Sequence, residues 1–156
     1  MLYRPNEGGK PVTVGVTIYV LMAKVSENDA GFETTLDMYF RQFWYEPRLS
    51  FAQKHDVNKM VYGSEMISKL WTPDTFIVNA VESLKPVRDD NSLLRISYTG
   101  DILFSKRISP TVRCSTNYTS FPMDRQTCTL EIESFGFTMS DVKYVSLPQN
   151  ILLPSF

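Results

Sequence analysis

Two cysteines mark the segment of this 156-residue chain whose chemistry is most specific. Cys114 and Cys128 enclose thirteen residues, and Asn117-Tyr118-Thr119 inside that loop is an acceptor sequence for N-glycosylation. Glycans and structural disulfides form in the same oxidising compartment, so the two features support each other. Closing a loop of this size would stabilise a fold by about 3 kcal/mol through chain entropy. The alternative is a cytosolic protein with two free buried thiols and an accidental glycosylation sequence.

A second candidate chemistry is recognition of a ligand that carries a carboxylate. Tyr39 and Arg41 stand two residues apart, so a strand would place both on one face. Arg41 offers a planar fork of donors that matches a carboxylate. Leu103, Ser105 and Arg107 share a face in the same way, and Ser105 adds a hydroxyl donor. The ordinary alternatives are a surface ion pair for Arg41, a cross-strand ion pair for Arg107 and a plain polar strand position for Ser105.

Aromatic residues elsewhere in the chain have the matching chemistry for an ammonium group. The rings of Phe76, Phe135 and Phe137 present negative faces that attract a cation, and Glu133 adds a carboxylate close to two of them. An arginine on one surface and these aromatics on another would suit a zwitterionic ligand. The ordinary alternatives are core packing for the three phenylalanines and a locally satisfied carboxylate for Glu133.

Composition excludes several other kinds of protein. Hydrophobic residues make up 43% of the chain and aromatics 13%, so we expect a folded domain of ordinary size. A net charge of -1 does not favour nucleic acid as a partner. Two cysteines and the single histidine, His55, are too few for a zinc site of such ligands, which takes about four. We expect neither a metal nor a cofactor. No apolar run approaches the roughly 18 residues of a membrane span, and no signal peptide is visible.

The elements that must position these residues are strands. Apolar residues alternate from Val12 to Val20, which predicts a strand with one buried face. A second alternation, from Thr34 to Trp44, puts Leu36, Met38 and Phe40 opposite Tyr39 and Arg41, and Pro47 interrupts the pattern that follows. Residues 92–99 and 102–109 flank Gly100 and predict a β-hairpin. A further strand is predicted over Thr127–Phe137, and short helical turns over Ser64–Leu70. Strands at this spacing predict an all-β sandwich.

At these residues the chain resembles a family. A thirteen-residue loop between cysteines that contains Phe121-Pro122-Met123-Asp124 is similar to the signature loop of Cys-loop receptors. Further segments resemble the glycine- and GABA-gated chloride channel branch, in the family's order. They are residues 9–15 (GKPVTVG), 39–44 (YFRQFW) with 47–49 (PRL), 70–76 (LWTPDTF), 93–97 (LLRIS) and 133–138 (ESFGFT). The resemblance covers nearly the whole chain, and five ordered motifs are far more specific than one.

The resemblance implies an immunoglobulin-like β-sandwich, the extracellular ligand-binding domain of a pentameric ligand-gated ion channel. It is expected to be a single partial domain over residues 1–156, truncated at both ends, without the transmembrane domain. The ligand would lie between neighbouring subunits. The resemblance places a principal group on one subunit: Phe76, Val78, Asn79, Glu133, Ser134, Phe135 and Phe137. It places a complementary group on the next: Tyr39, Arg41, Leu103, Ser105 and Arg107.

The implied partners are a neurotransmitter such as glycine, GABA or a similar amine, neighbouring subunits of a pentamer, and the membrane domain of a full-length receptor. That membrane domain would meet the loop that contains Glu27 and Asp29 and the Cys-loop tip with Phe121, Pro122 and Asp124. The Phe121–Pro122 bond is a candidate cis peptide. The Cys114–Cys128 disulfide and a glycan on Asn117 would fit the extracellular face of a postsynaptic type of plasma membrane.

Some positions depart from the family pattern and leave the ligand open. Val78 stands where acetylcholine-type subunits have a tyrosine, and Phe76 and Phe137 lack hydroxyls that many GABA-binding subunits have. Three alternatives stand beside the receptor domain. The first is a secreted pentameric binding protein of the same fold, and the second is an enzyme, for which the sequence offers no nucleophile–base set. The third is an immunoglobulin-like adhesion module, for which the cysteine spacing is too short.

Overall fold

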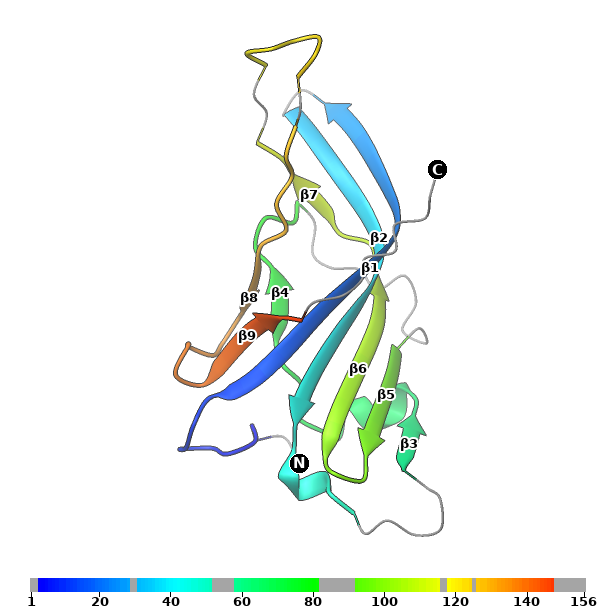
Figure 1. The fold of residues 1–156 in the computed structure, drawn as a ribbon, viewed down its shortest axis with the longest axis vertical. Coiled ribbons are helices and arrows are strands. Elements are labelled where there is room, and N and C mark those ends of the chain that lie inside the picture. Colours follow the sequence, from blue (N-terminus) through cyan, green and yellow to red (C-terminus); the bar gives the residue numbers. More distant parts are fainter. Residues whose placement is uncertain are drawn as a thin grey trace.

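The computed structural model describes residues 3–28, 31–51, 58–81, 92–115, 118–124 and 126–147, with the side chains of 27 and 28 left aside. Within these ranges the chain is built mainly of β-strands (Figure 1). The strands are β1 Val12–Asn28, β2 Gly31–Tyr45, β3 Lys59–Tyr62, β4 Thr75–Ile77, β5 Ser92–Ser97, β6 Asp101–Ile108, β7 Thr111–Arg113, β8 Ile132–Ser134 and β9 Val142–Ser146. A 3-10 helix covers Pro47–Leu49, and α1 covers Ser64–Ile67. No described helix has the length and apolar character that a membrane crossing needs.

The strands form two sheets. The larger sheet has the order β3-β5-β6-β2-β1-β9, with β7 also paired to β2, and the smaller sheet pairs β4 with β8. β1 and β9 run parallel, and the remaining pairs are antiparallel. β1 and β2 make a long hairpin that extends to the same end of the molecule as the loop after β7, as Figure 1 shows. The all-β, two-sheet prediction is therefore confirmed.

The core follows the alternation of β1 and β2. Val12, Val14 and Val16 are buried along β1. Along β2 the same face buries Met38, Phe40 and Trp44. Because a strand presents alternate residues to opposite faces, the residues between them stand on the outer face of the sheet. This outer face carries Tyr39 and Arg41, as the sequence predicted.

Aromatic contacts bind the helical region and β8 to this core. The rings of Trp44 and Trp71 meet edge to face, with centroids 6.0 Å apart, and Trp71 meets Phe137 at the same separation. Edge-to-face packing brings the positive edge of one ring to the negative face of another. These three rings connect β2 with the segments before β4 and after β8, and so hold the small sheet against the large one.

Most predicted elements are confirmed, with different bounds. The strand predicted from Val12 continues to Asn28, and the strand predicted from Thr34 begins at Gly31. The hairpin is confirmed, and its turn precedes Asp101, where β6 begins. Gly100 has a φ of 94°, and an added Cβ would lie 2.7 Å from the carbonyl oxygen of Glu46, so the turn requires glycine. The helical turns are confirmed over Ser64–Ile67.

The strand predicted over Thr127–Phe137 is wrong for most of its length, because only Ile132–Ser134 pairs with another strand. Before that strand, the backbone is bonded to a loop instead of a ladder: the side chain of Asn79 contacts Thr129 and Glu131. After that strand, the chain curves around Asp74. Apolar and polar residues alternate along this segment, but hydrogen bonds from the loop that contains Asn79 take the place of pairing with a neighbouring strand.

Candidate ligand-binding site

The complementary group lies together on the outer face of the large sheet. Arg41 of β2 pairs with Ser105 of β6, and Tyr39 pairs with Arg107. Ser105 in turn pairs with Leu93 of β5. A pocket of about 570 Å³ covers this area. Its lining contains all five predicted residues and three others from β5: Tyr39, Arg41, Ser92, Leu93, Arg95, Leu103, Ser105 and Arg107.

Arg41 has a guanidinium group that is available for a ligand. Its central carbon lies 6.0 Å from the ring centroid of Tyr39, a geometry that favours a cation–π contact. Within the part of the chain that the structure describes, Arg41 makes no ion pair. The same holds for Arg95, which lies in the same pocket. The half-buried residues Arg41 and Arg95 therefore have guanidinium groups that could bind an anionic group in this pocket.

Arg107 lies in the pocket but is bonded to Asp37. The Nε of Arg107 donates to Oδ1 of Asp37 at 2.9 Å, and its Nη2 donates to Oδ2 in a second, short hydrogen bond. The hydrogen bond to Arg107 lowers the pKa of Asp37, although partial burial opposes this shift. Arg107 therefore forms the cross-strand ion pair that was its ordinary alternative. The sequence did not indicate that its partner is Asp37.

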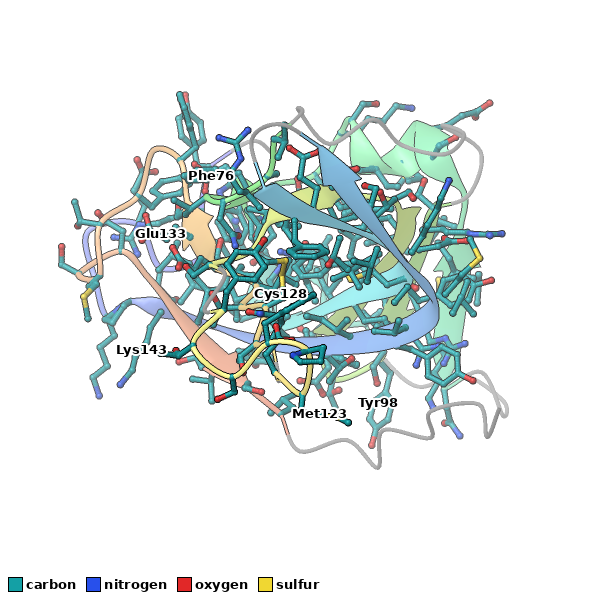
Figure 2. The ribbon with its side chains drawn as sticks, turned by 90° about the horizontal axis from the view of Figure 1, so that it is seen from above. Phe76, Tyr98, Met123, Cys128, Glu133 and Lys143 are labelled. Carbon is teal, nitrogen blue, oxygen red and sulfur yellow. A yellow bond between two sulfur atoms is a disulfide. The ribbon has the colours of Figure 1, made fainter. Side chains whose placement is uncertain are left out.

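The principal group contains an aromatic pair, one exposed ring and one half-buried ring, beside a carboxylate. The rings of Phe76 and Phe135 meet edge to face with centroids 6.0 Å apart, and Phe135 is 85% exposed. Glu133 is exposed and pairs with Phe76 in the small sheet, and Figure 2 shows the two labelled side chains close together. Two ring faces and a carboxylate on one surface are the groups that an ammonium ion prefers.

Asp74 holds the loop that presents Phe135. One carboxylate oxygen accepts a hydrogen bond from the hydroxyl of Ser134, and the other accepts from the backbone N–H of Gly136 at 2.5 Å. The carbonyl of Asp74 also accepts from the N–H of Phe135 at 3.3 Å. The motif Trp71-Thr72-Pro73-Asp74 did not by itself predict that Asp74 holds this loop. The sequence shows only an acidic residue just before a strand and a glycine in a distant segment, which does not indicate that the two are bonded.

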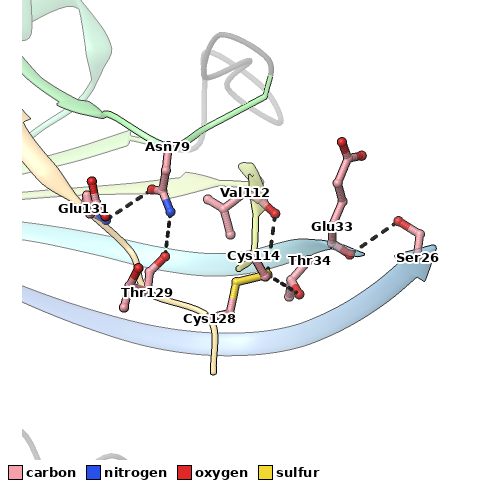
Figure 3. The surroundings of a disulfide bond; sticks show 9 residues. All are labelled: Ser26, Glu33, Thr34, Asn79, Val112, Cys114, Cys128, Thr129 and Glu131. Carbon is pink, nitrogen blue, oxygen red and sulfur yellow. Dashed lines mark hydrogen bonds between the residues drawn. A yellow bond between two sulfur atoms is a disulfide. The ribbon is translucent and has the colours of Figure 1, made fainter. Parts of the chain in front are cut away.

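Other members of the principal group make structural contacts. Phe137 packs on Trp71, which agrees with the core alternative for that ring. The Nδ2 of Asn79 donates to the carbonyl of Thr129 at 2.7 Å, and its Oδ1 accepts from the N–H of Glu131 at 3.2 Å, as Figure 3 shows. Val78 is exposed, and its N–H donates to the same Glu131. These residues shape the loop instead of presenting free polar groups.

A buried polar chain that was not predicted joins the two sheets below this loop. Gln42 of β2 is 1% exposed and donates from Nε2 to the hydroxyl of Thr75 in a short hydrogen bond. The hydroxyls of Thr75 and Tyr144 lie 2.7 Å apart, and Tyr144 also bonds to Ser134. Burial raises the pKa of Tyr144. Because buried polar groups need partners, this chain fixes β4, β8 and β9 against β2.

The disulfide predicted from the cysteine spacing is confirmed. Cys114 and Cys128 are bonded, with Cα atoms 4.8 Å apart, and the Sγ of Cys114 lies 3.3 Å from the Thr34 hydroxyl (Figure 3). The cis Phe121–Pro122 bond is confirmed as well. Asp124 accepts a short hydrogen bond from Gln126. The predicted residues Asp29, His55 and Asn117 lie outside the described residues, as does the side chain of Glu27.

The apolar tip of the disulfide-closed loop is exposed. Phe121 is 73% exposed and Met123 is 89% exposed. In Figure 1 this loop and the β1–β2 hairpin reach the same end of the molecule, away from the N-terminal segment. The pocket lining contains no member of the principal group, so one chain does not bring the two groups together.

The two-sheet fold and the disulfide-closed loop together define a receptor-type ligand-binding domain. Residues 1–155 match the family described as neurotransmitter-gated ion-channel ligand binding domain, and the chain belongs to that family. It is 36% identical over 141 residues to the gamma-aminobutyric acid receptor subunit rho-1 of Mus musculus and of Homo sapiens. It has the same identity over 141 residues to the gamma-aminobutyric acid receptor subunit beta of Caenorhabditis elegans.

These matches cover 89% of this chain but only 29% of each rho-1 relative and 25% of the beta relative. The chain thus spans less than a third of the length of these relatives. Family membership makes it a receptor domain and not an enzyme, which excludes the enzymatic alternative.

Proposed function

We propose that this chain binds a small zwitterionic amino acid of the GABA or glycine type between adjacent subunits of a pentamer. The observation that carries the proposal is the guanidinium of Arg41, which makes no ion pair with any described residue, in a pocket with Tyr39 and Ser105. A carboxylate entering this pocket would meet a bidentate donor and a hydroxyl, and it would displace no carboxylate of the described residues from Arg41.

The ammonium half of the ligand would be held by a second subunit. Half-buried Phe76 and exposed Glu133 of the small sheet, with exposed Phe135 just after β8, offer cation–π and ionic contacts. A ligand with both charges therefore needs both surfaces, which supports a site shared between neighbouring chains. The relatives described above are gamma-aminobutyric acid receptor subunits, which agrees with this ligand class.

Ligand binding by this domain, on the extracellular face of the plasma membrane, would be coupled to the opening of an anion-selective pore. Phe121, Pro122 and Asp124 would contact the membrane domain, as would Glu27 and Asp29. The exposure of Phe121 supports this role, and so does the position of the loop after β7 at the same end of the molecule as the β1–β2 hairpin (Figure 1). The ligand would act by shifting the population of a resting and an active arrangement of the ring.

A matched ligand series tests the binding site. GABA, butyrate and butylamine share a four-carbon chain but carry both charges, only the carboxylate and only the ammonium. Arg41→Gln should weaken GABA and butyrate by about tenfold or more and leave butylamine unchanged. Glu133→Gln should weaken GABA and butylamine instead. Binding is measured by calorimetry, and assembly by sedimentation with and without GABA. Equal losses for butyrate and butylamine in Arg41→Gln would remove Arg41 from the site.

A further inference from the structure

Asp37 stands beside the candidate carboxylate pocket without being part of its lining. It lies on β2, two residues before Tyr39, and therefore on the same face as Tyr39 and Arg41. Its side chain is 14% exposed, and both of its oxygens accept hydrogen bonds from Arg107. Asp37 therefore acts on the pocket through its hydrogen bonds to Arg107.

The register shows where the guanidinium of Arg107 is drawn. The Cα of Arg107 pairs with that of Tyr39, midway between Asp37 and Arg41 along β2. From that position a side chain can reach toward either neighbour. Arg107 reaches Asp37, so its guanidinium is held on the side of Tyr39 that faces away from Arg41. The bidentate geometry uses two of its donor groups and neutralises its charge.

The pocket lining contains three arginines, and the ion pair removes one of them from the charge that a ligand meets. Arg41 and Arg95 make no ion pair with the described residues, and Arg107 is neutralised. A ligand with one carboxylate can be held by Arg41 alone. A ligand with a second carboxylate would gain from a third free cation, because each added anionic group can form its own charge-assisted hydrogen bonds.

We propose that Asp37 is a specificity-determining residue: by holding Arg107 it lowers the affinity of the pocket for ligands with two carboxylates relative to those with one. The proposal rests on the proposed function, since it concerns the same pocket. Asp37 keeps the guanidinium of Arg107 from binding the second carboxylate of a dicarboxylate. A site can discriminate between two ligands by denying one of them a favourable contact.

The test compares butyrate with succinate, which share a four-carbon chain and differ in the number of carboxylates. The 156-residue chain is titrated with each, and the arginine Nε–Hε signals are followed by NMR. In Asp37→Asn the ratio of succinate affinity to butyrate affinity should rise about tenfold over that of the unaltered chain. The signal of Arg107 should respond to succinate only in that variant.

Three further variants complete the test. Glu33→Gln removes a carboxylate from the same strand, where Glu33 contacts Arg113 at 3.5 Å outside the pocket. It changes the net charge as Asp37→Asn does and should leave the affinity ratio unchanged. The double variant Asp37→Asn/Arg107→Gln removes both members of the ion pair and leaves the net charge unchanged, so it should return the ratio to that of the unaltered chain. Asp37→Ser removes the same carboxylate and should also raise the ratio, which keeps the idea testable where Asp37→Asn fails to fold.

The outcomes separate this inference from the proposed function. An unchanged ratio in Asp37→Asn, with butyrate still bound at Arg41, overturns the role of Asp37 alone. So does an equal rise in Glu33→Gln, which would make the effect one of net charge. A rise that persists in Asp37→Asn/Arg107→Gln would show that the effect does not come from the freed Arg107, and it overturns the inference too. If butyrate does not shift the Arg41 signal of the unaltered chain, the carboxylate site itself is refuted.

Discussion

The carboxylate of Asp74 binds the backbone of Gly136, 62 residues further along the chain, across a distance of 2.5 Å. Asp74 precedes β4, and Gly136 follows β8, so the bond closes the end of the two-stranded sheet. A Cβ on residue 136 would lie 3.2 Å from the same oxygen, which leaves little room for a side chain there. The loop that carries Phe135 is therefore held by Asp74, together with the hydroxyl of Ser134, which accepts from the N–H of Phe137 at 3.1 Å.

Replacement of Asp74 should release this loop. We expect Asp74→Ala to lower the free energy of unfolding by about 2 kcal/mol, because two hydrogen bonds to a charged acceptor are lost. Urea denaturation measures that change, and hydrogen exchange should show faster exchange at the amide of Gly136. Asp101→Ala, which removes an exposed carboxylate bonded to the hydroxyl of Thr99, is the control and should cost less. Unchanged protection of the Gly136 amide in Asp74→Ala would contradict this role.

Two glycines make a matched pair for the turn between β5 and β6. Gly100→Ala should lower the free energy of unfolding by about 2 kcal/mol, because alanine is strained at its positive φ and would clash with the Glu46 carbonyl. Gly63 has a negative φ of -82° and no atom near the position of a Cβ. Gly63→Ala should therefore cost less than about 1 kcal/mol. Thermal unfolding of both variants checks this order, and equal losses would refute the argument.

The ion pair of Asp37 with Arg107 should make stability depend on pH. The pKa of Asp37 is lowered from its ordinary value of 3.8, so the folded state favours the charged carboxylate. The stability that this pair contributes is then fully present above pH 3.8 and is lost as the pH falls through the lower, folded pKa. The difference in unfolding free energy between the unaltered chain and Asp37→Asn should shrink over that range.

Urea denaturation of both proteins from about pH 7 to about pH 2 measures this difference. Salt at about 1 M should reduce it at neutral pH, because part of the pair is exposed and is screened. A difference that stays constant over the whole pH range would mean that the pair does not stabilise the charged form of Asp37.

Sequence alone supported the strands with clear alternation and the positions of Tyr39 and Arg41. The period of two in β1 and β2 reports which face is buried, and that face was predicted correctly at Met38 and Phe40. It did not reveal Gln42, a polar residue that is buried at 1% exposure, because its partner Thr75, which in turn bonds to Tyr144, comes from a distant segment. A single-sequence pattern contains no information on such a pairing.

The chain's own residues therefore determined its family, its strand alternation, its disulfide loop and the cis bond at Pro122, since each of these depends on local spacing or on a motif. Tertiary structure alone decided that Arg107 is held by Asp37, that Asp74 orders the Phe135 loop, and that Asn79 replaces a strand ladder before β8. The physical reason is that a side chain's partner is set by which distant elements pack against it. The charge that a ligand meets in the pocket follows from those partners.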